Sequence, residues 1–233
     1  MAMQLGATFA DNNASISPFT ISYAGTTTGR GMVVAFEIQG NTSTITSVTV
    51  GTDVATLLPI NNNATMGYST QIAYITAMTG SGTQTVTVVW TGAESVIYGI
   101  AQEIYDDVTV GIALDGSNQA TGNSTSSTTS VTTGSANSAL LGFSIVGTGP
   151  HTIGSGFTSI RNGGTFNFEA LERNLDAGAA GSKTVDFTVT SGQWAISAAG
   201  FKASSGGGGV TTAQIAPALL QAQANQPWSS QYV

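Results

Sequence analysis

The chain has 233 residues, of which only 7% are charged; twelve acidic residues outweigh five basic ones, for a formal net charge of −7. The basic residues are scattered, which argues against binding to nucleic acid or an anionic membrane surface, because both are met by clustered lysine and arginine. The absence of cysteine excludes a disulfide framework, a thiolate metal site and a cysteine nucleophile.

The sequence predicts a succession of short β-strands from residue 19 onward. Each run alternates between apolar and polar residues or is continuously apolar, and most are followed by glycine, asparagine or serine. The predicted strands are 19–24, 31–38, 45–50, 54–58, 68–77, 83–90, 96–105, 112–121, 126–132, 139–146, 165–174, 183–190 and 194–202. The turn at residues 79–82, Thr-Gly-Ser-Gly, supplies the positive φ angles of a tight connection. This pattern predicts an all-β fold, an antiparallel β-sandwich or jelly roll, over residues 1–203.

The C-terminal part of the sequence differs from the strands. Residues 204–209 are Ser-Ser-Gly-Gly-Gly-Gly, which predicts a flexible linker. Residues 210–233 contain good helix formers, but Pro217 ends or kinks a helix unless the helix begins there. A disordered terminus is one interpretation. Because Leu219, Leu220, Trp228 and Tyr232 make this segment unusually apolar, we predict an extended or short-helical arm whose four apolar residues bind a neighbouring subunit.

Few titratable residues are candidates for chemistry. Glu169 and Glu172 are three positions apart in a predicted strand and should point to opposite faces, whereas Asp106 and Asp107 follow a strand end, where aspartate commonly forms turns. The single histidine, His151, follows Gly-Pro and is predicted to lie in a surface loop, with no nucleophile elbow in the sequence. The sequence therefore predicts no catalytic residues and no enzyme.

Metal and glycan sites also find little support. One histidine and no cysteine argue against zinc, and calcium would depend on residues 11–13 or 106–107 without a recognisable binding loop. No metal or cofactor is predicted. Trp90 and Trp194 lie in apolar runs and are interpreted as core residues, which leaves the polar loops without an aromatic platform for a sugar.

Three stretches carry a resemblance to a known class of module. They are ITSVTVGTDVATLL at 45–58, QIAYITAMTGSGTQTVTVVW at 71–90, and FEALER, GSKTVDFTV and QWAISAAGFK between residues 168 and 202. Together they resemble the jelly-roll-like β-sandwich modules of phage virion proteins and bacterial surface proteins. The resemblance implies a structural or adhesive module and supplies no active-site residues.

The resemblance and the composition lead to a functional expectation. The N-terminus has no basic and apolar signal pattern, which favours assembly in a host cytoplasm and a place in the virion. We expect a phage virion structural protein, a capsid decoration (cement) protein or a head or tail fibre subunit. It would form homo-oligomers and bind major capsid or other virion proteins.

Two other functions are weighed against this expectation. The alternative is a carbohydrate-binding or adhesive module with a glycan as its partner. An exposed aromatic residue beside polar side chains would support this alternative. A glycoside hydrolase would require Glu169 and Glu172 to face one groove.

Overall fold

The computed structural model describes residues 3–14, 17–40, 42–92, 96–105, 111–147, 149–162 and 169–204. The described residues form strands and no helix, which confirms the predicted all-β fold. The strands are β1 (Gln4–Ala14), β2 (Phe19–Thr26), β3 (Gly31–Gln39), β4 (Thr44–Val50), β5 (Asp53–Val54), β6 (Thr56–Leu57), β7 (Asn61–Asn63), β8 (Tyr68–Ile75), β9 (Gly82–Thr91), β10 (Val96–Tyr105), β11 (Ile112–Thr133), β12 (Ala139–Val146), β13 (His151–Ile153), β14 (Thr158–Asn162), β15 (Glu169–Asn174) and β16 (Gly181–Ala203).

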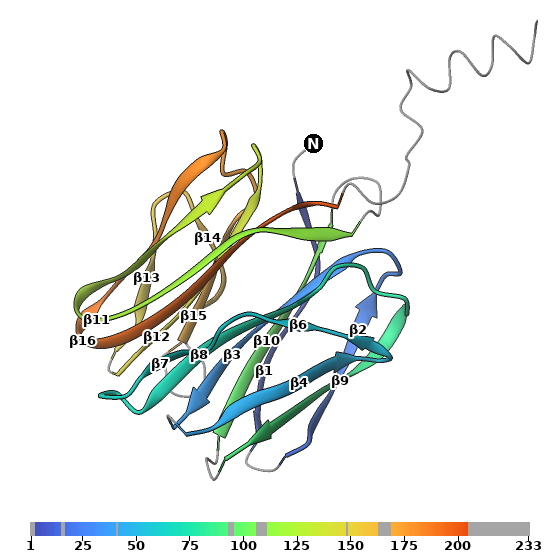
Figure 1. The fold of residues 1–233 in the computed structure, drawn as a ribbon, viewed down its shortest axis with the longest axis horizontal. Coiled ribbons are helices and arrows are strands. Elements are labelled where there is room, and N and C mark those ends of the chain that lie inside the picture. Colours follow the sequence, from blue (N-terminus) through green and yellow to red (C-terminus); the bar gives the residue numbers. More distant parts are fainter. Residues whose placement is uncertain are drawn as a thin grey trace, which may run out of the picture.

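The strands form three antiparallel sheets that are stacked in layers (Figure 1). Sheet A has the order β1-β10-β3-β8-β6, with β7 also paired to β8, and sheet B has the order β2-β9-β4-β5. Sheet C has the order β11-β16-β12-β15-β14, with β13 also paired to β16. Sheet A is a middle layer, because one of its faces packs on sheet B and the other on sheet C. The predicted β-sandwich is confirmed.

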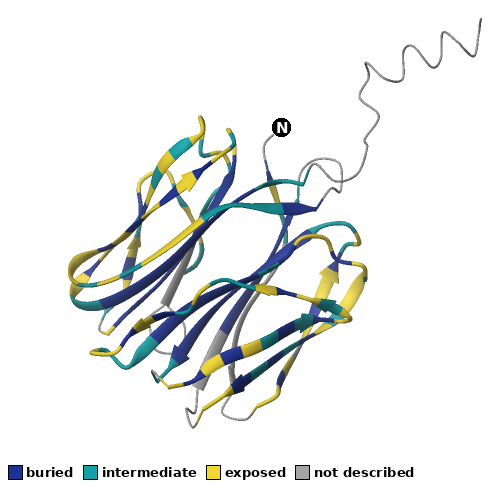
Figure 2. Cartoon of the chain, viewed as in Figure 1, coloured by how far each residue is buried: buried dark blue, intermediate teal, exposed yellow. Residues whose placement is uncertain are grey.

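Strand β3 shows how this stacking follows from the sequence. All its residues except Gln39 are buried. Because alternate side chains of a strand point to opposite faces, Met32 and Phe36 enter the core against sheet B, whereas Val33 and Ala35 enter the central core against sheet C. A strand with apolar side chains on both faces thus needs cover on both, and Figure 2 shows this as buried strands between more exposed outer layers.

Sheet C is folded over on itself. Strands β11 and β16 pair along almost their whole length, with an irregularity in register between Ser124 and Ser126. The two halves of this ribbon then lie face to face, since Gly116 lies against the carbonyl of Thr132, and the side-chain amide of Asn118 donates to the carbonyl of Ser130. A third apolar core, with residues from β11, β12 and β16, lies inside this folded sheet. The predicted strands 112–121 and 126–132 are parts of β11, and 183–190 and 194–202 are parts of β16.

The two halves of the chain repeat one strand arrangement. In residues 4–105, β3 lies between β10 and β8, and β9 lies between β2 and β4. In residues 112–203, β12 lies between the C-terminal half of β16 and β15, and the N-terminal half of β16 lies between the second half of β11 and β13. Strands β9 and β16 both open on a glycine with positive φ, Gly82 at 75° and Gly181 at 133°. We call residues 4–105 the first sandwich and residues 112–203 the second sandwich.

Several details of the sequence prediction can be compared with the structure. Of the glycines in the predicted turn at 79–82, Gly82 has a positive φ and Gly80 does not. Trp90 and Trp194 are buried as predicted. Strands β1, β7, β13 and β14 were not predicted, because they are short or polar. In the described part of the chain no helix is long and apolar enough to cross a membrane. The predicted linker, apart from Ser204, and the predicted arm at 210–233 lie outside the described residues.

Candidate functional site

The interior of each sandwich is lined by even-numbered residues of its central strand. Val34 and Phe36 of β3 face the interior of the first sandwich, and Leu140 and Val146 of β12 face the interior of the second. In the second sandwich Ser127, Ser144, His151 and Glu172 are buried. We call these four residues the polar cluster.

His151 is linked through Ser144 to Ser127 in a chain of hydrogen bonds in the second sandwich. Its Nε2 is 3.1 Å from Ser144 Oγ, which is 2.7 Å from Ser127 Oγ. Its ring also makes an edge contact with Phe187, at 5.3 Å between centroids. Burial lowers the pKa of His151 to about 4, so the ring is neutral at neutral pH. The prediction of a surface loop histidine is wrong, because β13 pairs with β16 and turns this side chain into the core.

Glu172 is a second buried titratable group. Its Oε2 accepts a hydrogen bond from the backbone N–H of Gly154 at 2.9 Å, and its Oε1 has no hydrogen-bond partner. Burial is the main cause that raises the pKa of Glu172 to about 8, with a further contribution from the charge of Asp186 and an opposing one from the Gly154 N–H. The side chain of Glu169, its predicted companion, lies outside the described side chains.

The polar cluster does not form an accessible catalytic site. Ser144 and Glu172 are 0% exposed and His151 is 3% exposed, so a substrate cannot reach the serine hydroxyl or the carboxyl. Nucleophilic or acid–base catalysis requires a reacting group within hydrogen-bond reach of such residues. The arrangement instead ties the facing layers of the second sandwich together, since Ser127 lies on β11 and Ser144 on β12.

The first sandwich buries a different ionic cluster. Glu103 Oε2 lies 2.9 Å from Arg30 Nη1, and its Oε1 accepts the N–H of Thr27 at 2.7 Å. The Arg30 guanidinium also stacks on the ring of Tyr105 at 3.5 Å. Burial and the nearby charge of Glu103 raise the pKa of Tyr23. These contacts join the β2–β3 connection to β10 and are structural.

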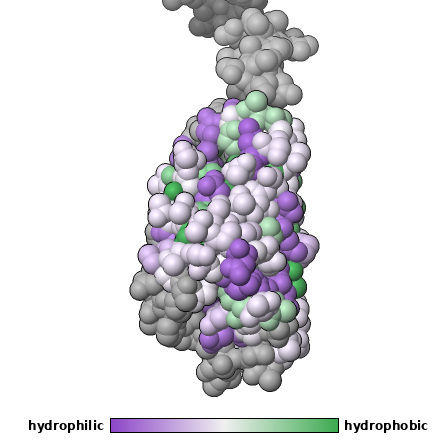
Figure 3. All heavy atoms as spheres, turned by 90° about the vertical axis from the view of Figure 1, so that its left-hand side faces the viewer, coloured by the Kyte–Doolittle hydropathy of each residue, from purple (hydrophilic) through white to green (hydrophobic). Residues whose placement is uncertain are grey.

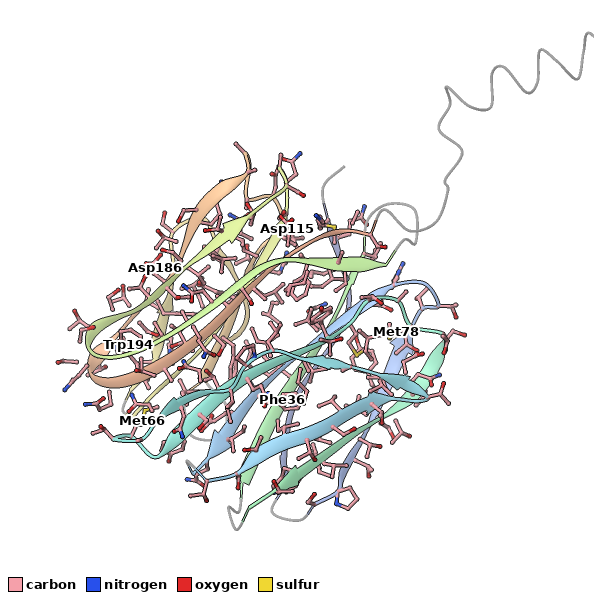
Figure 4. All side chains as sticks on the ribbon, in the orientation of Figure 1. Phe36, Met66, Met78, Asp115, Asp186 and Trp194 are labelled. Carbon is pink, nitrogen blue, oxygen red and sulfur yellow. The ribbon has the colours of Figure 1, made fainter. Side chains whose placement is uncertain are left out.

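Asp115 joins the ends of the folded ribbon in the second sandwich. Its carboxylate lies 3.1 Å from Lys202 Nζ and accepts hydrogen bonds from the Ser135 N–H at 2.9 Å and the Ser138 hydroxyl at 2.7 Å. Desolvation acts to raise the pKa of Asp115, but the hydrogen bonds from Ser138, Ser135 and Lys202 hold it below its ordinary value. Figure 4 shows Asp115 and Trp194 in different parts of the ribbon, with Asp115 near the start of β11 and Trp194 near the bend.

A pocket of about 200 Å³ lies where the first sandwich meets the edge of sheet C. It has an apolar part and a polar part and contains no charged residue; its lining is Leu58, Pro59, Ile72, Ala198, Ser117, Asn118, Gln119 and Ser197. The amide of Gln119 donates to the Ile60 carbonyl, and next to it Asn61 donates to the carbonyls of Ala120 and Ile196. The pocket is therefore a concave site with rigid neighbours on both sandwiches. The sequence held no signal for it, because its residues come from distant strands.

The sequence-predicted binding residues Leu219, Leu220, Trp228 and Tyr232 lie outside the described residues, as do Asp106 and Asp107. Among the residues that the structure describes, no group of three or more histidine, aspartate or glutamate side chains could hold a metal ion. No model of a known protein family matches the chain, and no curated protein is significantly similar to it.

Proposed function

We propose that this protein is a structural subunit of a phage virion, either a capsid decoration (cement) protein or a head or tail fibre subunit, that acts by binding other proteins. The observation that supports the proposal is that the outer face of sheet B is rich in hydroxyl groups and poor in charge. Thr20 pairs with Thr87, which also pairs with Thr49, and Ser22 pairs with Thr85, so hydroxyl side chains form cross-strand rows. Asp53 is the single charged residue in the four strands of this sheet.

An uncharged hydroxyl-rich face suits a large contact between proteins. Burying a charged side chain at an interface is costly unless it is paired, whereas threonine and serine present methyl groups and small hydrogen-bonding groups. Figure 3 shows the side of the molecule that lies at the left in Figure 1, where pale and purple atoms outnumber green ones. The carboxylates of Glu103 and Asp115 are paired with Arg30 and Lys202 inside the protein, which fits a protein whose function lies in its surfaces and in the arm.

The test is binding to virions of the phage that carries the gene. The full-length protein should co-purify with virions in a fixed ratio, and virions depleted of it should rebind it. Thr87→Arg places a charge in the middle of the outer face of sheet B and should weaken rebinding at least tenfold. Thr188→Arg, on an exposed position of the second sandwich, is the matched control. A protein that is absent from purified virions would contradict the proposal.

The arm is tested separately in the same assay. Deletion of residues 204–233 should reduce rebinding if Leu219, Leu220, Trp228 and Tyr232 contact neighbouring subunits. Unchanged rebinding would remove the arm from the proposal and leave sheet B as the binding surface.

A carbohydrate-binding function is the alternative, and the uncharged pocket with its amide and hydroxyl groups is the observation that favours it. It predicts specific binding on a glycan array that Asn118→Ala reduces. Its weakness is the lack of an aromatic ring in the lining.

A further inference from the structure

The pocket between the sandwiches borders an open sheet edge. Strand β11 is the outermost strand of sheet C, and residues 116–133 of it contain no charged residue and no proline. Natural edge strands are usually protected by charges, prolines or a covering segment, because their free backbone groups can pair with another strand. Residues 117–119 of this strand line the pocket, so an apolar recess lies beside the outermost described strand of sheet C.

The described chain ends close to this pocket. Ser204 donates its backbone N–H to Gly111, beside the start of β11, and 29 residues follow it in the sequence. Along the ribbon, Ala203 pairs with Ile112, and Ala198, which lines the pocket, pairs with Asn118. The five residue steps from Ala198 to Ala203 correspond to about 17 Å of strand. A fully extended linker of residues 204–209 spans about 20 Å, which is enough to return to the pocket.

The chain after the linker matches the site in its chemistry. Residues 210–233 contain no charged side chain, and neither does the pocket lining. Covering the pocket with this segment therefore desolvates no charged side chain. A tethered segment also has an effective concentration near the millimolar range, so weak individual contacts suffice for occupancy.

We propose that the pocket and the adjoining edge of β11 hold the C-terminal arm of the same chain, residues 210–233, with the Leu219–Leu220 pair in the apolar part of the pocket. The assignment concerns the free protein, so it stands apart from the proposed place in a virion. A sugar fits the site less well, because the side-chain N–H groups of Asn118 and Gln119 already donate to Ser130 and Ile60, and the lining holds no aromatic ring.

Cross-linking tests this directly, because the chain has no native cysteine. Ser117→Cys at the exposed rim is combined with Ala218→Cys, which leaves both leucines in place. At micromolar concentration a short bis-maleimide reagent should yield a cross-linked monomer. The control combines Ala218→Cys with Ser22→Cys, an exposed position on sheet B, and should cross-link at least fivefold less.

Three results would overturn the proposal. Equal yields from both pairs would mean that the arm does not dock at the pocket. Cross-linked dimers in place of monomers would assign the pocket to the arm of a second copy. Displacement of the arm from the Ser117→Cys pair by a methyl glycoside probe would make the pocket a sugar site.

A second measurement avoids cysteine chemistry. Ser117→Arg places a charge at the exposed rim and should expose the arm, so that chymotrypsin cleaves after its leucine and aromatic residues several-fold faster than in the unmodified protein. Thr188→Arg, away from the pocket, should leave that rate unchanged. Equal cleavage rates in Ser117→Arg and the unmodified protein, with both folded by circular dichroism, would contradict docking.

Discussion

At the scale of single residues, the second sandwich buries a serine, a histidine and a carboxyl in its interior. Ser144 and Glu172 are 0% exposed, and His151 is 3% exposed. A buried carboxyl with one oxygen unpartnered is costly in its charged form. The protein tolerates Glu172 because the carboxyl can remain protonated, and this makes stability depend on pH.

The first prediction concerns the pH dependence of Glu172. Because its pKa is raised to about 8, the folded protein keeps a proton that the unfolded chain releases, and the free energy of unfolding falls as pH rises from the unfolded pKa toward 8. His151 has the opposite effect, because its pKa is lowered to about 4 from 6.5. It makes the free energy of unfolding rise between pH 4 and 6.5 and adds no further change above pH 6.5. Between pH 6.5 and 8 we expect the protein to lose about 1–2 kcal/mol, at 1.4 kcal/mol per unit.

Urea unfolding at several pH values in that window measures the effect. Glu172→Gln should show no such loss, whereas Asp176→Asn, which alters an exposed carboxylate in a turn, should behave like the unmodified protein. An equally steep fall in Glu172→Gln would refute the assignment.

The second prediction concerns the hydrogen-bond chain through Ser144. Ser144→Ala removes the partner of both Ser127 and His151 and leaves two buried polar groups unsatisfied in part. The free energy of unfolding should fall by about 1–3 kcal/mol. Ser182→Ala, at an exposed position of β16, is the matched control and should change it by less than about 0.5 kcal/mol.

At the scale of elements, the short strand β7 fastens the first sandwich to the second. The amide of Asn61 donates to Ala120 at 2.8 Å and to Ile196 at 2.9 Å, and the amide of Asn63 donates to Trp194 at 2.9 Å. These asparagines donate to carbonyl groups of β11, the outermost described strand of sheet C, and of β16 beside it. A strand of three polar residues thus has a defined role that its sequence does not suggest.

The third prediction tests this connection. Asn61→Ala removes the amide that donates to the carbonyls of Ala120 and Ile196 and should lower the free energy of unfolding by about 1–3 kcal/mol. Hydrogen exchange should become faster in β7 and in the neighbouring part of β11. Asn62→Ala, whose side chain is exposed on the same strand, should produce a much smaller change; equal effects would argue against the connection.

At the scale of the whole molecule, the central core makes one cooperative unit of the two sandwiches. Val33, Ala35 and Ile72 of sheet A pack with Leu141 and Phe143 of sheet C. An edge contact between Tyr74 and Phe201, 5.5 Å between centroids, lies in the same core. Because this core is buried from both sides, neither sandwich can unfold without exposing the apolar face of the other.

The fourth prediction follows from this shared core. Phe143→Ala should lower the stability of both sandwiches together, by about 3–5 kcal/mol. Trp90 is buried in the first sandwich and Trp194 in the second, so their fluorescence reports on the two sandwiches separately. To observe one of them alone, the remaining two tryptophans of the chain are replaced by phenylalanine. Both reporters should shift to the same lower urea midpoint. Separate midpoints would show that the sandwiches unfold independently.

The sequence by itself determined the class of the fold and most of its strands. Alternating and β-branched runs predict strands because the side chains of a strand point alternately to opposite faces, and the glycine at residue 82 predicts a turn because it adopts positive φ. Apolar surroundings in sequence were also enough to predict that Trp90 and Trp194 are buried. A repeat was detectable in principle, since TVTVVW at 85–90 and TVDFTV at 184–189 occupy equivalent strands.

Only the tertiary structure decided which faces meet. Local periodicity shows that β3 is apolar on both faces, but not that sheet B covers one face and sheet C the other, because that pairing joins residues far apart in the chain. The same holds for His151. Its turn-like neighbours in sequence predict an exposed side chain, but in the structure the pairing of β13 with β16 buries it. The pocket beside β11 likewise exists only because the sandwiches stack, since its lining comes from β8, β11, β16 and the segment before β7.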